Sequence, residues 1–349
     1  EMAMSYNALF GYEDAAGYFE QVLAIPMQPR DIYFQFGKAL WGMKEYVRSG
    51  QMLTTHIEWV AKQDESYESR VRGYELYQLL GDSYYYRRPT ADYPTAIDYY
   101  KKSLADRPDQ KRLLQNIAVG YHSMKSYAQA LDYYQQRIDL GMDEKSASMY
   151  KNAGYCALNM ANNSGDDDDE DIDEEEIDEV IENTPAADVN YFEVAVGYLQ
   201  QYLEYKPDEI KVVQAVANTY LYQLADCINA IKFYEKILEI EPENCDAKKS
   251  IGYAFFGELG GTCSKNYGRA LTHLKAAYNC KGGGCEDPDL VMWIAQCYHL
   301  RAAAKAEKEL DANDDFKNSF EWYGKVLKCD PSNSIAKKGQ DQVRFEFVE

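Results

Sequence analysis

The stretch YQLLGDSY, Tyr77–Tyr84, sets the pattern of the whole chain. It reads Tyr-x2-Leu-Gly-x2-Tyr, and fifteen residues after Gly81 the stretch AIDYY begins with Ala96 and ends with Tyr100. Residues three, four and seven apart share one face of an α-helix. A small residue on that face lets a partner helix approach, and a large ring fills the space beside it. The stretch therefore predicts two packed helices joined by a turn, and Pro108 marks the end of the second helix.

The same pattern recurs in phase along nearly the whole chain. The small residue of the first helix is, in order, Ala3, Gly37, Gly81, Ala118, Gly154, Ala217, Gly252 and Ala295. The small residue of the second helix is Ala15, Ser49, Ala96, Ala130, Ala195, Ala230, Ala270 and Ser319. This pattern resembles the tetratricopeptide repeat (TPR) family, whose consensus is W-x2-L-G-x2-Y, then A-x3-F, then Pro; Tyr77 here replaces the Trp. The resemblance implies an all-α, right-handed superhelical solenoid of about eight helix-turn-helix repeats.

We expect a single solenoid over residues 1–349, with the first repeat truncated at its N-terminus. The segment from Ser334 to about Phe347, SIAKKGQDQVRFEF, is more polar than the other predicted helices. A terminal repeat needs a polar outer face, so we expect residues 334–349 to form a C-terminal capping helix.

An acidic insertion interrupts the fifth repeat. The two small residues of a repeat are usually twelve apart, but Gly154 and Ala195 are forty-one apart, and residues 162–190 account for the excess. Within them, Ser164–Glu179 carries twelve carboxylates in sixteen residues. Because loop closure costs only about 0.6 kcal/mol per doubling of length, the stack can accommodate the insertion. We interpret it as a solvated acidic loop, with weak cation binding as the alternative.

Other turns inside repeats are lengthened too. Gly252 and Ala270 are eighteen apart, and Ala295 and Ser319 are twenty-four apart. Turns of this type lie on one edge of a solenoid, so repeats five to eight should have a decorated edge, and insertions in repeats often lie on a binding face.

The charge of the chain excludes some partners. The net charge is −21, and without the twelve acidic residues it is still −9. Nucleic acid and anionic membranes reward positive charge, so we expect neither as a partner. No apolar run is long enough to span a bilayer, so we expect no membrane insertion.

The sequence contains none of the motifs that would indicate an enzyme. None of the four histidines lies in H-E-x-x-H, and G-x-S-x-G, G-x-x-x-x-G-K-[ST] and G-x-G-x-x-G are all missing. The glycine-rich stretch Lys281–Pro288 lies where a turn between repeats is required anyway. We therefore predict no catalytic residues, no cofactor and no metal site.

The eight cysteines leave their redox state open. The repeat register places Cys227 and Cys263 in the inner turns of neighbouring repeats, on the same edge, which makes them a possible disulfide. Cys245, Cys280, Cys285 and Cys329 lie near the opposite edge. Scattered reduced cysteines are the alternative, and a sequence alone cannot decide the connectivity.

The TPR resemblance also implies a concave surface, lined by the first helices, that binds peptides. With the small residue as position 8 of each repeat, positions 5, 9 and 12 form a flank beside the core stripe. The candidate partner-binding residues on this flank are Lys38, Trp41, Asp82, Tyr85, Gln115, His122, Lys151, Tyr155, Gln214, Asn218, Lys249, Tyr253, Gln296 and His299.

These observations predict a non-enzymatic interaction scaffold that binds a protein or peptide in this groove. The lysines favour a partner segment with acidic residues or a free carboxylate. One alternative is a structural subunit that engages partners through the decorated edge, and another is an enzyme or small-ligand binder with a pocket that the sequence does not reveal. The start at Glu1 instead of Met and the placement of Cys227 and Cys263 favour an extracytoplasmic location, with the cytoplasm as the alternative.

Overall fold

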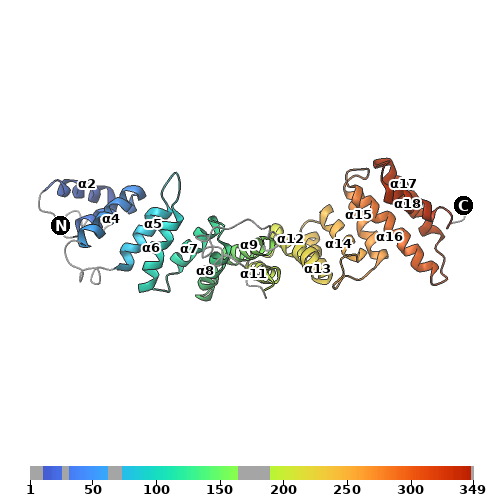
Figure 1. Ribbon diagram of the computed structural model, residues 1–349, viewed down its shortest axis with the longest axis horizontal. Coiled ribbons are helices and arrows are strands. Elements are labelled where there is room, and N and C mark those ends of the chain that lie inside the picture. Colours follow the sequence, from blue (N-terminus) through green and yellow to red (C-terminus); the bar gives the residue numbers. More distant parts are fainter. Residues whose placement is uncertain (1–10, 26–30, 62–72, 164–188, 347–349) are drawn as a thin grey trace, which may run out of the picture. The chain divides into compact units, whose positions relative to one another are not determined.

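The computed structural model describes residues 11–25, 31–61, 73–163 and 189–346. In these ranges the chain forms sixteen α-helices and one π-helical turn (Figure 1). They are α2 (Tyr12–Leu23), α3 (Ile32–Gly42), α4 (Tyr46–Ala61), α5 (Gly73–Tyr85), α6 (Tyr93–Asp106), α7 (Lys111–Ser123), α8 (Tyr127–Asp139), α9 (Ser148–Asn163), α11 (Tyr191–Tyr205), α12 (Ile210–Asn218), η1 (Thr219–Gln223), α13 (Cys227–Ile240), α14 (Cys245–Phe256), α15 (Tyr267–Cys280), α16 (Pro288–Ala306), α17 (Asn313–Cys329) and α18 (Ser334–Val343).

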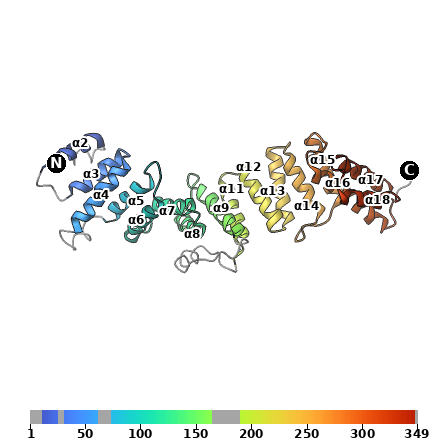
Figure 2. The same cartoon turned by 45° about the horizontal axis from the view of Figure 1, so that its top comes forward.

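Consecutive helices pack as pairs. The first and second helices of a repeat lie side by side in α3–α4, α5–α6, α7–α8, α14–α15 and α16–α17, as Figures 1 and 2 show. The predicted all-α fold of helix-turn-helix pairs is therefore confirmed. The first helix predicted for repeat one, around Ala3, lies outside the described residues.

The small residues and the large rings meet inside each pair. Gly81 on α5 faces the ring of Tyr100 on α6 so closely that a Cβ atom at Gly81 would lie 2.4 Å from a ring carbon. Gly252 on α14 faces Leu274 on α15 in the same way, at 2.6 Å. Tyr100 and Leu274 are both completely buried. Burial of each such side chain contributes about 1.5–3 kcal/mol, so this contact helps to stabilise the pairs α5–α6 and α14–α15.

The start of many helices is fixed by a side-chain cap. An Asp or Asn side chain accepts a hydrogen bond from the backbone N–H three residues on, which satisfies one of the helix's unpaired donors and contributes about 1 kcal/mol. The capping residues are Asp92, Asp226, Asn244, Asn266, Asp287 and Asn333. Pro follows directly in α16 and lies within the first two positions of α6, where its missing N–H is not needed.

The chain divides into two compact units, Glu1–Tyr191 and Phe192–Glu349, which we call unit 1 and unit 2. The division falls between the two helices predicted for repeat five. The acidic residues 164–188 lie outside the described part of the chain. A single continuous solenoid over both units stays a prediction.

The C-terminal segment ends the helical array of unit 2. Helix α18 packs against α17 and buries Ala336 and Val343. It ends at Val343, earlier than the polar pattern suggested, and a turn follows. Over the described ranges, none of the helices combines the length and the apolar character that a bilayer crossing requires.

Candidate functional site

The predicted partner-binding residues all lie on first helices. They occupy α3, α5, α7 and α9 in unit 1 and α12, α14 and α16 in unit 2. Their environments differ, however, and several of them already make contacts within the chain.

In unit 1, Asp82 is completely buried and forms the centre of a hydrogen-bond network. Its Oδ1 accepts from Tyr100 Oη at 2.7 Å and from Arg112 Nη1 at 2.6 Å. Its Oδ2 accepts from Trp41 Nε1 at 3.2 Å and from Arg112 Nη2 at 3.1 Å. The donors come from three helices around α5, so the carboxylate connects repeats two, three and four. The structure thus places Asp82, and the indole nitrogen of Trp41, inside the repeat stack.

Other predicted residues of unit 1 also have partners in the chain. Lys38 Nζ lies 2.6 Å from Glu75 Oε1. Tyr85 packs against Tyr86, with ring centroids 4.8 Å apart, and burial strongly raises its pKa. His122 Nδ1 lies 3.4 Å from Cys156 Sγ, and burial lowers the pKa of this histidine.

The remaining candidates of unit 1 are Gln115 on α7 and Lys151 and Tyr155 on α9, and all three side chains are half-buried. For these three, contact with a partner stays a prediction.

Unit 2 presents a row of aromatic rings from three successive repeats. Tyr253 on α14 stacks on Trp293 on α16, with centroids 4.4 Å apart and planes 23° apart. Tyr253 also stacks on Tyr222 of η1, with centroids 6.3 Å apart and planes 28° apart. Tyr222 is 49% exposed, so one end of the row is open to solvent. We call Tyr222, Tyr253 and Trp293 the aromatic row.

Lysine charges beside the aromatic row are balanced by carboxylates. Lys249 Nζ lies over the Trp293 ring, 5.0 Å from its centroid, and 2.7 Å from Asp287 Oδ2. Lys281 also reaches Asp287, at 3.2 Å, and Asp246, at 2.9 Å. Burial is the largest single effect and acts to raise the pKa of Asp287. The hydrogen bonds from Lys249, Lys281 and the backbone N–H of Leu290, together with the charge of Lys249, outweigh it and hold that pKa below the ordinary value. Lys249 is therefore part of a neutralised cluster that fixes the face of Trp293.

Sequence reasoning found Tyr253 and Lys249 but missed Tyr222 and Trp293. In the repeat numbering, Trp293 is at position 6 and Tyr222 at position 13, both outside the predicted flank. Residues Thr219–Gln223 form a π-helical turn, which takes up more residues per turn than an α-helix. The residues beyond such a turn are displaced around the helix, so α-helical periodicity could not place Tyr222.

The other predicted residues of unit 2 lie close to the second helices. The Oδ1 of Asn218 accepts a hydrogen bond of 2.6 Å from Tyr234 Oη, although Asn218 itself is exposed. His299 Nδ1 lies 3.3 Å from Tyr323 Oη, and burial lowers the pKa of His299.

Gln214 on α12 and Gln296 on α16 are half-buried. For Gln214 and Gln296, contact with a partner stays a prediction. No group of three or more His, Cys, Asp or Glu side chains that could hold a metal ion occurs in the described ranges.

Three disulfides connect parts of unit 2. Cys227, at the start of α13, is joined to Cys263 in the inner turn of the next repeat, as their common edge suggested. Cys245–Cys280 and Cys285–Cys329 are equivalent to each other, because each joins the beginning of a repeat to the last residue of its second helix. Cys156 and Cys297 are buried free thiols. Burial raises the pKa of both thiols to about 12, which makes them poor nucleophiles.

The in-phase register, the helix pairs and the small-against-large contacts define the class of protein: the chain has the tetratricopeptide-repeat fold. No family model and no curated protein matches its sequence. Several solved structures are similar to it at low identity. They include YrrB, described as a TPR protein with an unusual peptide-binding site (14% identity, 70% of this chain and 99% of that chain, TM-score 0.42). They also include the C-terminal part of a TPR repeat-containing protein from Cytophaga hutchinsonii (15% identity, 97% of this chain and 98% of that chain, TM-score 0.40). A third is MamA (20% identity, 60% of this chain and 93% of that chain, TM-score 0.39).

Proposed function

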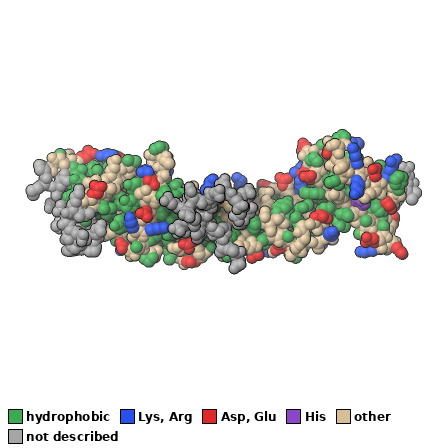
Figure 3. All heavy atoms as spheres, in the orientation of Figure 1, with side chains coloured by type: hydrophobic (Ala, Val, Ile, Leu, Met, Phe, Trp, Pro, Cys, Tyr) green, Lys and Arg blue, Asp and Glu red, His purple; other side chains and the backbone are tan. Residues whose placement is uncertain are grey.

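We propose that this chain is a non-enzymatic interaction scaffold whose aromatic row binds an extended segment of a partner protein. The observation that carries the proposal is the row itself. Three rings from three successive repeats form a stacked surface with one open end at Tyr222. Stacked repeats offer extended surfaces to their partners, and aromatic rings supply large contact area with little loss of side-chain freedom. Figure 3 shows that acidic and basic side chains are interspersed over the visible face of each unit.

The charges beside the row bear on the kind of segment it would bind. A partner carboxylate can approach Lys249 only in competition with Asp287, 2.7 Å away. Ion pairs at the rim of an interface contribute about 0.2–1 kcal/mol, whereas a few buried rings usually dominate the binding energy. Apolar and aromatic side chains of the partner should therefore provide most of the affinity, and an acidic group should add a smaller part.

The test begins with photo-crosslinking from the exposed end of the row. A photoreactive phenylalanine derivative in place of Tyr222 should capture a partner in the source cell. The same group in place of Leu310, which is 58% exposed in the lengthened turn of repeat eight, is the control for the decorated edge. Capture from position 310 but not from position 222 would support the structural-subunit alternative and contradict the proposal.

The captured partner then allows affinities to be compared by calorimetry. Tyr222→Ala and Tyr253→Ala should each weaken binding by about 2 kcal/mol, which is roughly 30-fold. Lys249→Ala should weaken it at most about fivefold, because the pair is partly exposed and Lys281 still neutralises Asp287. Tyr222 lies at the surface, so its replacement leaves the core unchanged; normal binding by both tyrosine variants would rule out the row.

We also propose that the chain matures in an oxidising, extracytoplasmic compartment. Six of its eight cysteines are paired, and such pairing is typical of secreted and periplasmic proteins. Peptide mapping without reduction, on protein from its native source, should recover all three disulfides. Recovery of eight free thiols would mean a reducing compartment instead.

A further inference from the structure

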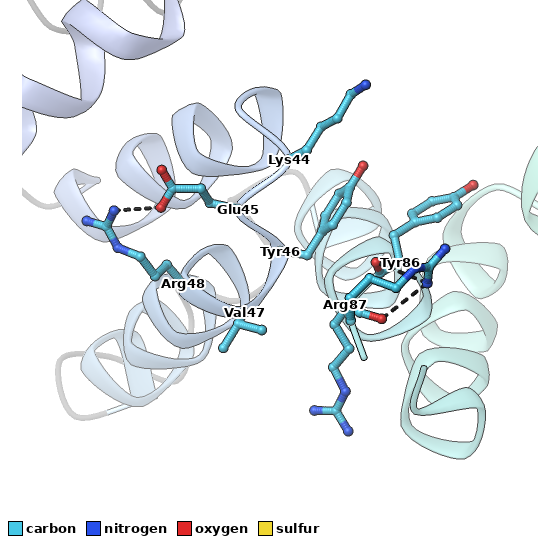
Figure 4. A pocket seen from close by; sticks show the side chains of 8 residues that line it. Lys44, Glu45, Tyr46, Val47, Arg48, Tyr86 and Arg87 are labelled. Carbon is cyan, nitrogen blue, oxygen red and sulfur yellow. Dashed lines mark hydrogen bonds and ion pairs between the residues drawn. The ribbon is translucent and has the colours of Figure 1, made fainter. Parts of the chain in front are cut away.

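A second concave feature lies in unit 1, on the edge formed by the inner turns of repeats two and three. A depression of about 520 Å³ opens between the start of α4 and the end of α5, where Lys44, Tyr46, Tyr86 and Arg88 line it (Figure 4). It continues into a second depression of about 370 Å³ along α4. The two share Tyr46, Val47 and Arg87, so together they form one groove beside α4. We call it the edge groove.

Two of the cations in the edge groove are already neutralised. Arg48 pairs with Glu20, at 2.7 Å, and with Glu45, at 2.6 Å. Arg87 pairs with Asp92, at 2.8 Å. These ion pairs fix the walls of the groove and leave little charge for a ligand.

The other two cations, Lys44 and Arg88, are exposed and contact no carboxylate within the described part of the chain. Arg88 Nη1 donates to two backbone carbonyl oxygens, that of Arg87 at 3.2 Å and that of Tyr86 at 3.5 Å. This pair of uncompensated cations lines a single depression. It creates a local positive site, since exposed charges farther away than about 10 Å are largely screened at 0.1 M salt.

Two tyrosine hydroxyls accompany these cations. The rings of Tyr46 and Tyr86 lie 5.5 Å apart, and Figure 4 shows Lys44 and both rings extending to the same side. Burial, together with the neighbouring Tyr86 and Asp82, raises the pKa of Tyr46, so its hydroxyl remains a hydrogen-bond donor at neutral pH. This end of the groove is therefore lined by two cations and two O–H donors.

The floor of the edge groove suits a chain rather than a small ion. Val47, which is 53% exposed, offers an apolar contact beside the cations. Farther along, the side chains of Gln51 and Thr55 add polar groups to the wall of the second depression. A peptide backbone needs such polar groups beside it, because its N–H and C=O groups require hydrogen-bond partners.

We propose that the edge groove is a docking site for an acidic peptide segment of a partner protein, whose carboxylates bind at Lys44 and at Arg88. Charge complementarity selects this occupant: the uncompensated cations require an anion, and the groove that leads away from them accommodates the chain that carries it. The site shares no residue with the aromatic row. Its test and that of the proposed function can therefore succeed or fail separately.

The probe is a fluorescein-labelled octapeptide of alternating Glu and Ala, and fluorescence anisotropy measures its binding to the full chain. The variant Lys44→Gln/Arg88→Gln should bind it about 2- to 30-fold more weakly, the range expected for two exposed ion pairs. Tyr46→Phe/Tyr86→Phe keeps both rings but removes the donors, and should weaken binding about 2- to 10-fold for each hydroxyl that bonds a carboxylate. Raising the salt from about 50 to about 200 mM should weaken binding to the parent more than to the double Gln variant.

Lys125 provides a matched control. It occupies the same left-handed backbone position in the inner turn of repeat four, with φ of 64° against 61° for Lys44, and it is equally exposed but lines neither depression of the edge groove. Lys125→Gln should bind the probe like the parent, and a peptide of alternating Gln and Ala should bind at least tenfold more weakly than the probe.

Four results would overturn the proposal. The first is failure of the parent to bind the probe, which would also occur if the chain's own acidic segment filled the groove. The second is unchanged binding by the double Gln variant, and the third is an equal loss with Lys125→Gln. The fourth is displacement of the probe by an equimolar amount of inorganic phosphate, which would indicate a site for small anions. Because Lys44 and Arg88 are exposed, misfolding would not explain a loss of binding, and circular dichroism of each variant checks this point.

Discussion

Removal of one disulfide should destabilise unit 2 and leave unit 1 unchanged. The variant Cys285→Ala/Cys329→Ala opens a link with a sequence separation of 44 that encloses α16. In the loop-entropy model, closing a loop of this length costs the unfolded chain about 13 cal/mol/K, which is about 4 kcal/mol at 25 °C. Cys285 is exposed and Cys329 is half-buried, so the lost side chains themselves contribute little. Nearly the whole effect should therefore come from the link.

Hydrogen exchange followed by mass spectrometry is the appropriate assay, because two units need not unfold in one transition. Amides of α16 and α17 that exchange through unfolding of unit 2 should lose about 1,000-fold in protection, the factor that corresponds to 4 kcal/mol. Amides of α5 to α8 in unit 1 should not change, because that unit contains only the free thiol of Cys156.

Reduction completes the comparison. The reduced parent and the reduced variant should show the same protection in α17, because neither has the link. A loss of less than tenfold under oxidising conditions, or a difference that persists after reduction, would refute the loop-entropy reasoning. In that case, the stability of repeat eight would come from its packing around Trp322 and Tyr323 alone.

Two further predictions concern buried polar groups of unit 1. His56 is 1% exposed, neither ring nitrogen has a partner in the described residues, and burial lowers its pKa. As the pH falls, His56 therefore takes up a proton in the unfolded chain before it does so in the folded one. Unit 1 should be most stable above about pH 6.5, and its free energy of unfolding should fall by up to about 1.4 kcal/mol per pH unit below that. His56→Leu should reduce this dependence on pH, measured by hydrogen exchange of α4. Asp82→Asn replaces an acceptor of four hydrogen bonds by a group with donors of its own. It should lower the free energy of unfolding of unit 1 by about 2–4 kcal/mol in the same assay, less than for a fully buried pair because the Arg112 side chain is 43% exposed. A change below about 0.5 kcal/mol would mean that the network does not stabilise the unit.

The fold could be predicted from the sequence because its determinants are local and repeated. A small residue such as Gly81 and a ring such as Tyr100 are separated by one short turn, and the same spacing occurs again and again along the chain. Each occurrence confirms the register of the others. A single feature without this repetition, such as the end of α18 at Val343, was predicted less well.

The candidate site could be predicted only in part, because side-chain environment does not follow from register. Asp82 and Tyr253 both occupy position 9, yet the first is completely buried and the second forms part of the aromatic row. The difference arises from residues in neighbouring repeats: Arg112 and Trp41 meet Asp82, whereas Trp293 meets Tyr253. Such neighbours lie 30 to 41 residues away in the sequence, and no alignment of one repeat with the next indicates which of them will touch.

The edge groove could not be predicted from the sequence either. Lys44 and Arg88 each look like an ordinary charged residue of a turn. Both occupy position 15 of their repeats, but so does Lys125, which lines neither depression, so the register alone does not mark them. What distinguishes them is that they line one depression together and contact no carboxylate of the described residues, whereas the neighbouring Arg48 and Arg87 do. A ligand in this depression would not have to displace a carboxylate from either cation, so an external anion meets little competition there. That distinction appears only when every ion pair around the inner turns has been placed in space.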